Sequence, residues 1–568
     1  MKKLKIVIIL LCTILLTSCQ KPATDNSQIQ NKFDQFVDSI PSQILDPASP
    51  SLNQLFTDPN NVSLKPQLNV WPDYDIDKYK KELATMEQLK QELLSFNHSK
   101  LQSLQQETYD VLSLSLEKNY DFDDTAFFYL DNNPLGAYKG ETSNAFLTLY
   151  FYNIRNEFDI QSYINLVDTL PNYAQTMVNF EQQRQDNGYG LTPTEIKMSI
   201  DNLQKTIDIN EFGFLSEAIT KKINDLNIPS EIKDKYLKNI NSKLINNVYN
   251  FFVSCQKGLK ELNVLQKDNI VLGDLKHGKG YASYLIYINT GFKDFNDYYD
   301  YIYKKYEENN KELNSLLTNN PNLNLSGNPY TDIENPNELL SYLKKATQED
   351  FHFTVDVKYN MVQLPEAFKS LMPGTGAFYY ISPLDDPHAD QEMMLNNAYS
   401  PADFPTIAHE GYPGHMYQHV FSNNLRLPYI RNLLSTPDFT EGYANYVEGI
   451  VTKYAKDPIT AQINRLNEKS VYYLLLMIDG QLHFKLADNA LETLEVAFQD
   501  KETAIKIYHQ LSFTPFVFAP YYVGGSLVED MYASVKNKVD LIKFNEEIIS
   551  HGNLPLNKLR DIINRKFK

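Results

Sequence analysis

Apolar residues recur at intervals of three and four along most of the chain between about residue 31 and residue 350. Leu83, Met86 and Leu89 belong to one such stretch. This spacing places apolar side chains on one face of a helix, which then packs against its neighbours. The pattern predicts a mainly α-helical first half.

The periodicity changes to alternation in two short segments of the second half. Residues 351–357 and 376–381 alternate apolar and polar side chains, as strands do. We therefore expect a small β element in an otherwise helical second half, about residues 351–568. The free edge of such a sheet can pair with another extended chain, or the two strands can form a hairpin that only closes one side of the core.

The composition is that of one large globular body. Of 568 residues, 22% are charged and 42% are apolar, and no change in composition separates modules. The formal net charge of −18, without a basic patch, argues against nucleic acid as a partner. The sequence therefore predicts one domain over residues 31–568.

The first residues have the form of an export signal. A basic head precedes an apolar run, residues 6–16, that is too short for an ordinary membrane span. The run ends in Leu-Thr-Ser-Cys19, which resembles a bacterial lipobox, in which Cys19 is diacylated after cleavage. We expect residues 1–18 to be a signal peptide and residues 19–30 a polar tether. Plain secretion with a coincidental cysteine is the alternative.

One stretch of the second half combines residue types that bind metal ions. Ala408-His-Glu-Gly-Tyr-Pro-Gly-His415 holds two imidazoles and a carboxylate within seven residues. A catalytic zinc ion takes nitrogen or carboxylate ligands at three positions and leaves a fourth for water. His409 and His415 are therefore candidate ligands of one zinc ion per chain, and Glu410 is the candidate general base.

The spacing of these histidines is unusual. His409 and His415 are six residues apart, so on an unbroken helix their side chains would point about 120° apart. Pro413 lacks an N–H and its ring clashes with the carbonyl of His409, while the glycines on either side permit unusual backbone angles. We expect the helix to break here and to turn His415 back toward His409. His415 and His419 are an alternative pair that suits a straight helix.

The third ligand is expected from another helix, which Thr436 and Pro437 open as cap and first residue. Glu441 and Glu448 are seven residues apart on it and therefore share one face with apolar Ala444. A carboxylate on such a face needs a partner, and a metal ion is one. We interpret Glu441 as the third ligand and Glu448 as the carboxylate that orients a ligand histidine. Two solvated glutamates are the alternative.

Two further groups are candidate hydrogen-bond donors to the substrate carbonyl oxygen, on which negative charge develops during hydrolysis. Asp479 and His483 are one helical turn apart, so the carboxylate can hold the imidazole in one tautomer. Tyr521 lies beside a glycine-containing bend, and its hydroxyl can serve the same purpose. A buried structural His-Asp pair and an ordinary tyrosine among 39 are the alternatives.

Together these segments resemble a bacterial family known as domain of unknown function 885, which is grouped with gluzincin-type metallopeptidases. Its HEGxPGH-like motif is similar to residues 409–415, and its EGW-A-x-Y-x-E-like helix to residues 441–448. A D-x-G-L-H-like turn is matched loosely by residues 479–483. A late motif corresponds to residues 515–524, which aligns its tyrosine with Tyr521.

The chain departs from the family pattern at two positions near the metal ligands. Met416 stands where a further histidine often follows the motif, and Tyr443 stands where tryptophan is usual. The resemblance implies a mainly helical metallopeptidase-like fold, with the site in a cleft between two helical halves, about residues 31–350 and 351–568. It also implies a small strand element near the zinc.

The sequence thus predicts an extracytoplasmic, lipid-anchored zinc peptidase, with peptide substrates and the membrane as its partners. A catalytically inactive helical binding or scaffold lipoprotein is the alternative, and metal content separates the two. The substrate-binding lipoprotein of an importer would need repeated strand–helix alternation, which the chain lacks. No G-x-S-x-G motif supports a serine hydrolase.

Overall fold

The computed structural model of the chain describes residues 26–567 apart from residues 139, 357, 373, 374, 435 and 488. The predicted signal peptide and Cys19 lie outside the described residues. Residues 26–30, which we expected in the tether, already form the start of the first described helix.

Helices build the first half, as the apolar periodicity predicted. In α4, for example, Leu89 and Leu93 are buried, and Asp75 caps the first turn by accepting hydrogen bonds from two backbone N–H groups. The helices of this half are α2 (Asn26–Ile44), α3 (Ser51–Leu55), α4 (Ile76–Leu94), α5 (Ser103–Ser115), α6 (Asp124–Asp131), α7 (Glu141–Phe151), α8 (Glu157–Asp186), α9 (Pro193–Ile209), α10 (Gly213–Asn224), α11 (Ser230–Asn241), α12 (Leu244–Glu261), α13 (Gly278–Thr290), α14 (Phe295–Asn319) and α15 (Pro336–Ala346).

The second half is also mainly helical but contains the strands. Its elements are β1 (Tyr359–Gln363), α16 (Ala367–Leu371), β2 (Ala377–Tyr380), β3 (Gln391–Leu395), α17 (Phe404–Glu410), α18 (His415–Asn424), α19 (Tyr429–Leu433), α20 (Pro437–Val451), α21 (Pro458–Phe484), α22 (Ala490–Phe498), α23 (Lys501–Phe513), α24 (Ala519–Val535), α25 (Leu541–Ile549) and α26 (Leu556–Phe567). Short 3₁₀ turns are η1 (Pro59–Val62), η2 (His98–Lys100), η3 (Leu272–Asp274), η4 (Thr347–Glu349), η5 (Pro401–Asp403) and η6 (Thr452–Tyr454). The prediction of a mainly α fold with a small β element is confirmed.

The sheet has the order β1-β3-β2, with β1 parallel and β2 antiparallel to β3. The prediction of a strand at residues 351–357 is wrong, because residues 351–356 have no regular structure and the first strand begins at Tyr359. The rings of Phe351 and Phe353 stack on each other, 6.2 Å apart from centroid to centroid, and pack against the core. The alternating pattern of this segment therefore reflects one buried side, and no neighbouring strand pairs with residues 351–356.

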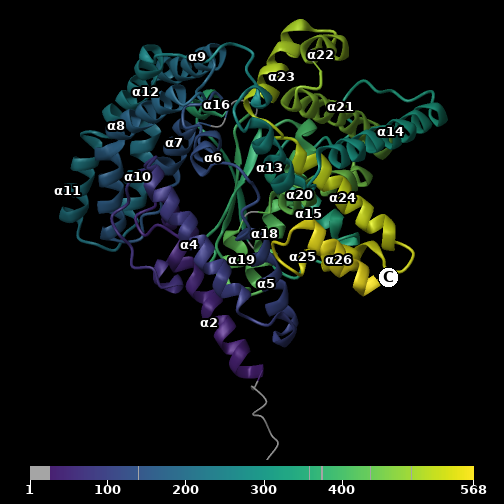
Figure 1. The fold of residues 1–568 in the computed structure, drawn as a ribbon, viewed down its shortest axis with the longest axis horizontal. Coiled ribbons are helices and arrows are strands. Elements are labelled where there is room, and N and C mark those ends of the chain that lie inside the picture. Colours follow the sequence, from purple (N-terminus) through teal and green to yellow (C-terminus); the bar gives the residue numbers. More distant parts are fainter. Residues whose placement is uncertain are drawn as a thin grey trace, which may run out of the picture.

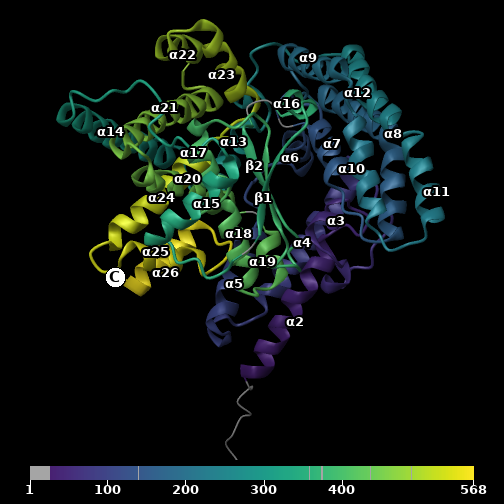
Figure 2. The same cartoon turned by 180° about the vertical axis from the view of Figure 1, so that it is seen from behind.

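The sheet lies between two groups of helices (Figures 1 and 2), each of which forms a large hydrophobic cluster. Neighbouring side chains of β3 point to opposite faces, so Met394 joins the cluster of α7–α12 and Met393 joins the cluster of α15, α17, α18, α20 and α24–α26. α13 and α14, which precede residue 350, pack against α20, α21 and α24 of the second half. Helices from both halves therefore pack against one another.

Within residues 26–567, apart from the undescribed positions, no helix combines the length and the apolar character needed to cross a membrane.

Candidate metal centre

The predicted helix break is present. α17 ends at Glu410, and α18 begins at His415. Gly414 permits the turn between them, because a Cβ atom at this position would lie 1.8 Å from the carbonyl oxygen of His409. No other residue type fits such a close approach of two backbone segments.

α20 holds this turn from the other side. The hydroxyl of Tyr443 donates a hydrogen bond to the carbonyl of Pro413 at 2.9 Å. The rings of His409 and His415 consequently lie 4.6 Å apart, centroid to centroid, and perpendicular to each other. The distortion thus brings together two histidines that an unbroken helix would separate.

Glu441 of α20 meets both histidines. Its Oε2 atom lies 3.6 Å from Nε2 of His409 and 3.3 Å from Nε2 of His415. Within the described residues this buried oxygen accepts no hydrogen bond. Ligands about 2.1 Å from a tetrahedral zinc ion lie about 3.4 Å from one another. The distances from Glu441 to the two histidines therefore fit the spacing between ligands of one zinc ion.

Glu410 stands beside this set. Ligand atoms of His409, Glu410 and His415 lie within 4.8 Å of one another. Oε2 of Glu410 accepts a hydrogen bond from the backbone N–H of Tyr379 in β2 at 2.9 Å. Because this bond ties Glu410 to the sheet while Oε2 of Glu441 has no donor, Glu441 fits the ligand position better. Burial raises the pKa of Glu410, which suits a general base.

Glu448 lies behind His409, two turns along α20 from Glu441. Its Oε1 atom is 2.6 Å from Nδ1 of His409, and its Oε2 atom is 2.6 Å from Nη1 of Arg465. A protonated Nδ1 that donates to a carboxylate leaves Nε2 free to bind a metal. Burial alone would raise the pKa of Glu448, but Arg465 and His409 hold it below its usual range.

The charges of the centre favour a cation. Burial alone would lower the pKa of His409, but the nearby carboxylates of Glu441 and Glu448 raise it well above its usual value. Burial likewise opposes ionisation of Glu441, yet His415 and His409 hold its pKa far below the ordinary value. The buried carboxylates thus stabilise positive charge between His409 and Glu441, which a proton or a metal ion can supply.

A close contact between α20 and α24 positions Tyr521. A Cβ atom on Gly442 would lie 2.6 Å from the backbone of Gly524, and one on Gly524 would lie 2.4 Å from the carbonyl oxygen of Asp438. The two helices therefore touch backbone to backbone. This contact brings the ring of Tyr521 to 6.0 Å from the ring of His409.

Tyr521 remains a hydrogen-bond donor in this position. Burial raises the pKa of its hydroxyl well above the usual value, and the carboxylates of Glu441 and Glu410 raise it further. A phenol that keeps its proton beside the candidate ligands can donate a hydrogen bond to a developing oxyanion.

The structure does not bring His483 and Asp479 to this centre. Both are fully buried, and they face each other at 3.3 Å. Nδ1 of His483 accepts from the N–H of Leu272, and Nε2 contacts the carbonyl of Leu511. His483 follows Arg465 by 18 residues on α21, which is about 27 Å along the helix axis. The pair therefore links three segments of the core. His483 is accordingly not among the candidate hydrogen-bond donors of the metal centre.

His419 also has a place away from His415. Its Nε2 atom lies 3.2 Å from the carbonyl of Ser382 and 3.0 Å from the side-chain nitrogen of Asn423. Burial lowers the pKa of His419 to about 4. These contacts leave the alternative pair His415 and His419 without a shared site.

Arg465 and the N–H of Tyr379 were not predicted. A signal for Arg465 exists in the sequence, because the cation lies among apolar Ala461, Ile463 and Leu466 on a long helix. An arginine on an apolar face usually has a buried acidic partner. Nothing in the sequence marks the backbone donor at Tyr379.

Two solved structures share this fold. A "putative lipoprotein from Colwellia psychrerythraea" has a TM-score of 0.76 and 16% identity, over 95% of this chain and 99% of that chain. A "putative lipoprotein of unknown function from Shewanella oneidensis" has a TM-score of 0.57 and 14% identity, over 95% of this chain and 100% of that chain. At these identities the likeness concerns the fold alone. The comparison with curated proteins found no match.

The model of a family described as "Bacterial protein of unknown function (DUF885)" matches residues 292–563. This segment contains α17, α18, α20, α21 and α24, and with them every residue of the candidate metal centre. The resemblance drawn from the motifs is therefore confirmed over residues 292–563, which match the DUF885 family of bacterial proteins of unknown function.

Proposed function

We propose that the chain is a zinc-dependent hydrolase of peptide bonds. The observation that carries the proposal is the convergence of His409 Nε2, His415 Nε2 and Glu441 Oε2 at 3.3 and 3.6 Å, with Glu410 beside them. Three protein ligands with an open fourth position are typical of catalytic zinc, whereas structural sites are closed. The set would hold one zinc ion per chain.

The residues around the metal site suit the steps of hydrolysis. A zinc ion held by His409, His415 and Glu441 would lower the pKa of a bound water toward neutral pH. Glu410, buried and held by the N–H of Tyr379, would take a proton from the attacking water and deliver it to the leaving amine. The hydroxyl of Tyr521 donates a hydrogen bond to the carbonyl oxygen on which charge develops.

The position of β2 favours an extended peptide as the substrate. Within the described residues β2 pairs only with β3, so its other edge carries no strand. The N–H of Tyr379 on this edge reaches Glu410 of α17. A peptide backbone that pairs along the edge of β2 would pass directly by Glu410.

A lipid anchor at Cys19 and an extracytoplasmic location are part of the proposal. The apolar run that ends in Leu-Thr-Ser-Cys19 supports both. The two similar structures carry the description "putative lipoprotein". α2, which follows this segment, projects from the edge of the body (Figure 1), so a tether on it can reach a membrane without crossing the fold.

Zinc content and peptide cleavage test the function. The purified protein should hold close to one zinc ion per chain and cleave members of a mixed peptide library, and a chelator should abolish cleavage. Glu410→Gln should keep the metal and lose cleavage, because the amide cannot accept the proton. Glu392→Gln, which alters an exposed carboxylate on neighbouring β3, is the matched control and should leave both unchanged.

The alternative is a helical binding or scaffold lipoprotein without catalysis. It predicts the same fold and no metal-dependent cleavage of any peptide in the library. Cleavage that persists in Glu410→Gln would remove Glu410 from the mechanism. Cleavage that ignores removal of every divalent ion would end the proposal.

A further inference from the structure

Arg465 of α21 connects two helices at the back of the metal centre. Its side chain is only 5% exposed. Nη2 donates to the backbone carbonyl of Asn445 at 2.8 Å and to its side-chain oxygen at 2.7 Å, while Nη1 lies 2.6 Å from Oε2 of Glu448. One planar guanidinium therefore binds two residues of α20, Asn445 and Glu448, which are three positions apart.

The contact with Glu448 continues to the metal ligands. Glu448 uses its second oxygen for Nδ1 of His409, at 2.6 Å. Because both oxygens of this carboxylate are engaged, it cannot rotate without losing one partner. The line Arg465, Glu448, His409 thus fixes the direction in which the imidazole presents Nε2.

Arg465 has further partners besides Asn445 and Glu448. Nη1 also lies 3.1 Å from Oε2 of Glu468, and the guanidinium carbon lies 5.7 Å from the ring centre of Tyr522. The hydroxyl of Tyr522 donates to the other oxygen of Glu468 at 2.7 Å. Tyr522 follows Tyr521 on α24, so this helix reaches the metal ligands with one tyrosine and the guanidinium with the next.

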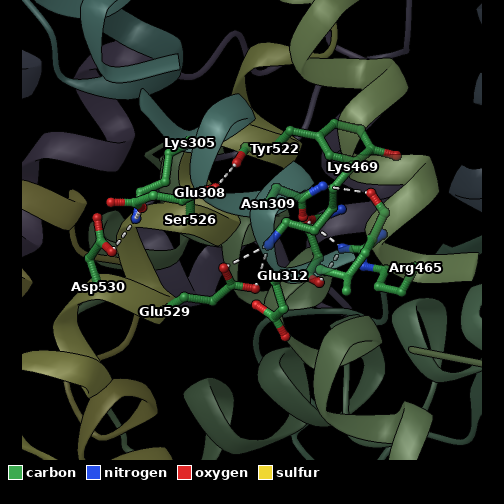
Figure 3. A network of polar contacts seen from close by, with 12 residues as sticks. Lys305, Glu308, Asn309, Glu312, Arg465, Lys469, Tyr522, Ser526, Glu529 and Asp530 are labelled. Atoms are coloured by element: carbon green, nitrogen blue, oxygen red, sulfur yellow. Dashed lines mark hydrogen bonds and ion pairs between the residues drawn. The ribbon is translucent and has the colours of Figure 1, made fainter. Parts of the chain in front are cut away.

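We infer that Arg465 is a positioning residue of the metal centre, which acts through Glu448 to hold His409 in the orientation that binds the metal. The inference rests on the proposed zinc site. A buried ion pair that only stabilises the fold is the competing explanation. A second buried ion pair on the same helix provides a comparison for this explanation. Lys469, one turn further along α21, contacts both oxygens of Glu529 at 2.7 and 2.9 Å (Figure 3).

The zinc affinity of purified variants, measured by competition with a chromogenic chelator, tests the inference. Arg465→Gln should bind zinc more weakly, by up to the about 10- to 100-fold that follows from losing the outer partner of a ligand histidine, which here is Glu448. Lys469→Gln breaks a similar buried pair without touching Glu448 and should keep the affinity within about 2-fold of the wild type. Thermal unfolding of both variants measures how much each loses in stability.

A double-mutant cycle shows whether Arg465 acts through Glu448. In a Glu448→Gln background, Arg465→Gln should weaken zinc binding by much less than in the wild type. Equal losses in both backgrounds, unchanged affinity in Arg465→Gln, or equal losses in Arg465→Gln and Lys469→Gln would each overturn the inference.

If Arg465→Gln does not fold, Arg465→Lys replaces it. Lysine keeps the charge but cannot bridge Asn445 and Glu448 with a planar fork, so zinc affinity should still fall measurably. A folded Arg465→Lys with wild-type affinity would refute the positioning role. Wild-type protein that binds no zinc would end both this inference and the proposed function, whereas zinc binding that no Arg465 variant alters would end only this inference.

Discussion

Gly414→Ala is expected to dismantle the metal centre with the smallest possible change. The added Cβ would lie 1.8 Å from the carbonyl oxygen of His409, whereas real Cβ contacts are no shorter than 3.0 Å. The backbone at one of these residues must therefore move by about 1.2 Å. Metal–ligand distances tolerate deviations of only about 0.2 Å, so His409 or His415 leaves the coordination sphere.

We expect zinc affinity to fall at least about 100-fold, since the change displaces a ligand and not merely its outer partner. Overpacking of the turn should also cost about 1–3 kcal/mol of folding free energy. Competition with a chelator measures the first effect, and denaturant unfolding measures the second.

Gly449→Ala in α20 is the matched control. A Cβ there would meet nothing closer than Oε1 of Glu529 at 3.7 Å, which is an ordinary contact. Alanine in a helix interior is about 0.5–1 kcal/mol more favourable than glycine, so this variant should be slightly more stable and bind zinc normally. Wild-type zinc affinity in Gly414→Ala would refute the reasoning, because the turn would then not set the ligand geometry.

Two further variants test groups near and far from the centre. Burial raises the pKa of Asp438 from 3.8 to about 6, so the folded protein binds more protons than the unfolded chain between these pH values and its stability falls as pH rises through them. Asp438→Asn should therefore be up to about 3 kcal/mol more stable than the wild type at pH 7 and lose this advantage below about pH 4; parallel pH–stability curves for the two proteins would contradict this. His483→Ala removes a fully buried ring with both nitrogens engaged and should cost about 2–4 kcal/mol in denaturant unfolding without altering zinc affinity. A loss of zinc affinity in folded His483→Ala would connect this residue to the centre after all.

Local backbone chemistry made part of the site predictable. A proline between glycines in a helical segment forces a break wherever the helix lies in the fold, so the turn before His415 follows from the sequence alone. The shared face of Glu441 and Glu448 follows from helical periodicity in the same way. Both conclusions concern residues close together in the chain.

Predictions that depended on a distant partner were less successful. Helical spacing pairs Asp479 with His483, yet it does not say that this end of α21 lies about 27 Å from Arg465, along the helix axis. The alternation of Phe351 and Phe353 marks a buried side, but a strand also needs a neighbour, and the neighbour of β1 is β3. The partner of Arg465 lies on another helix, so only its need for one is visible in the sequence.

The ligands and their supports come from α17, α18, α20, α21 and α24, which lie far apart along the second half of the chain. A partly folded molecule can hold at most an incomplete set of donor atoms. If these residues bind zinc as proposed, tight metal uptake must follow the docking of these helices. The zinc occupancy of a preparation would then measure the fraction of molecules that have reached the native packing, even before any substrate is known.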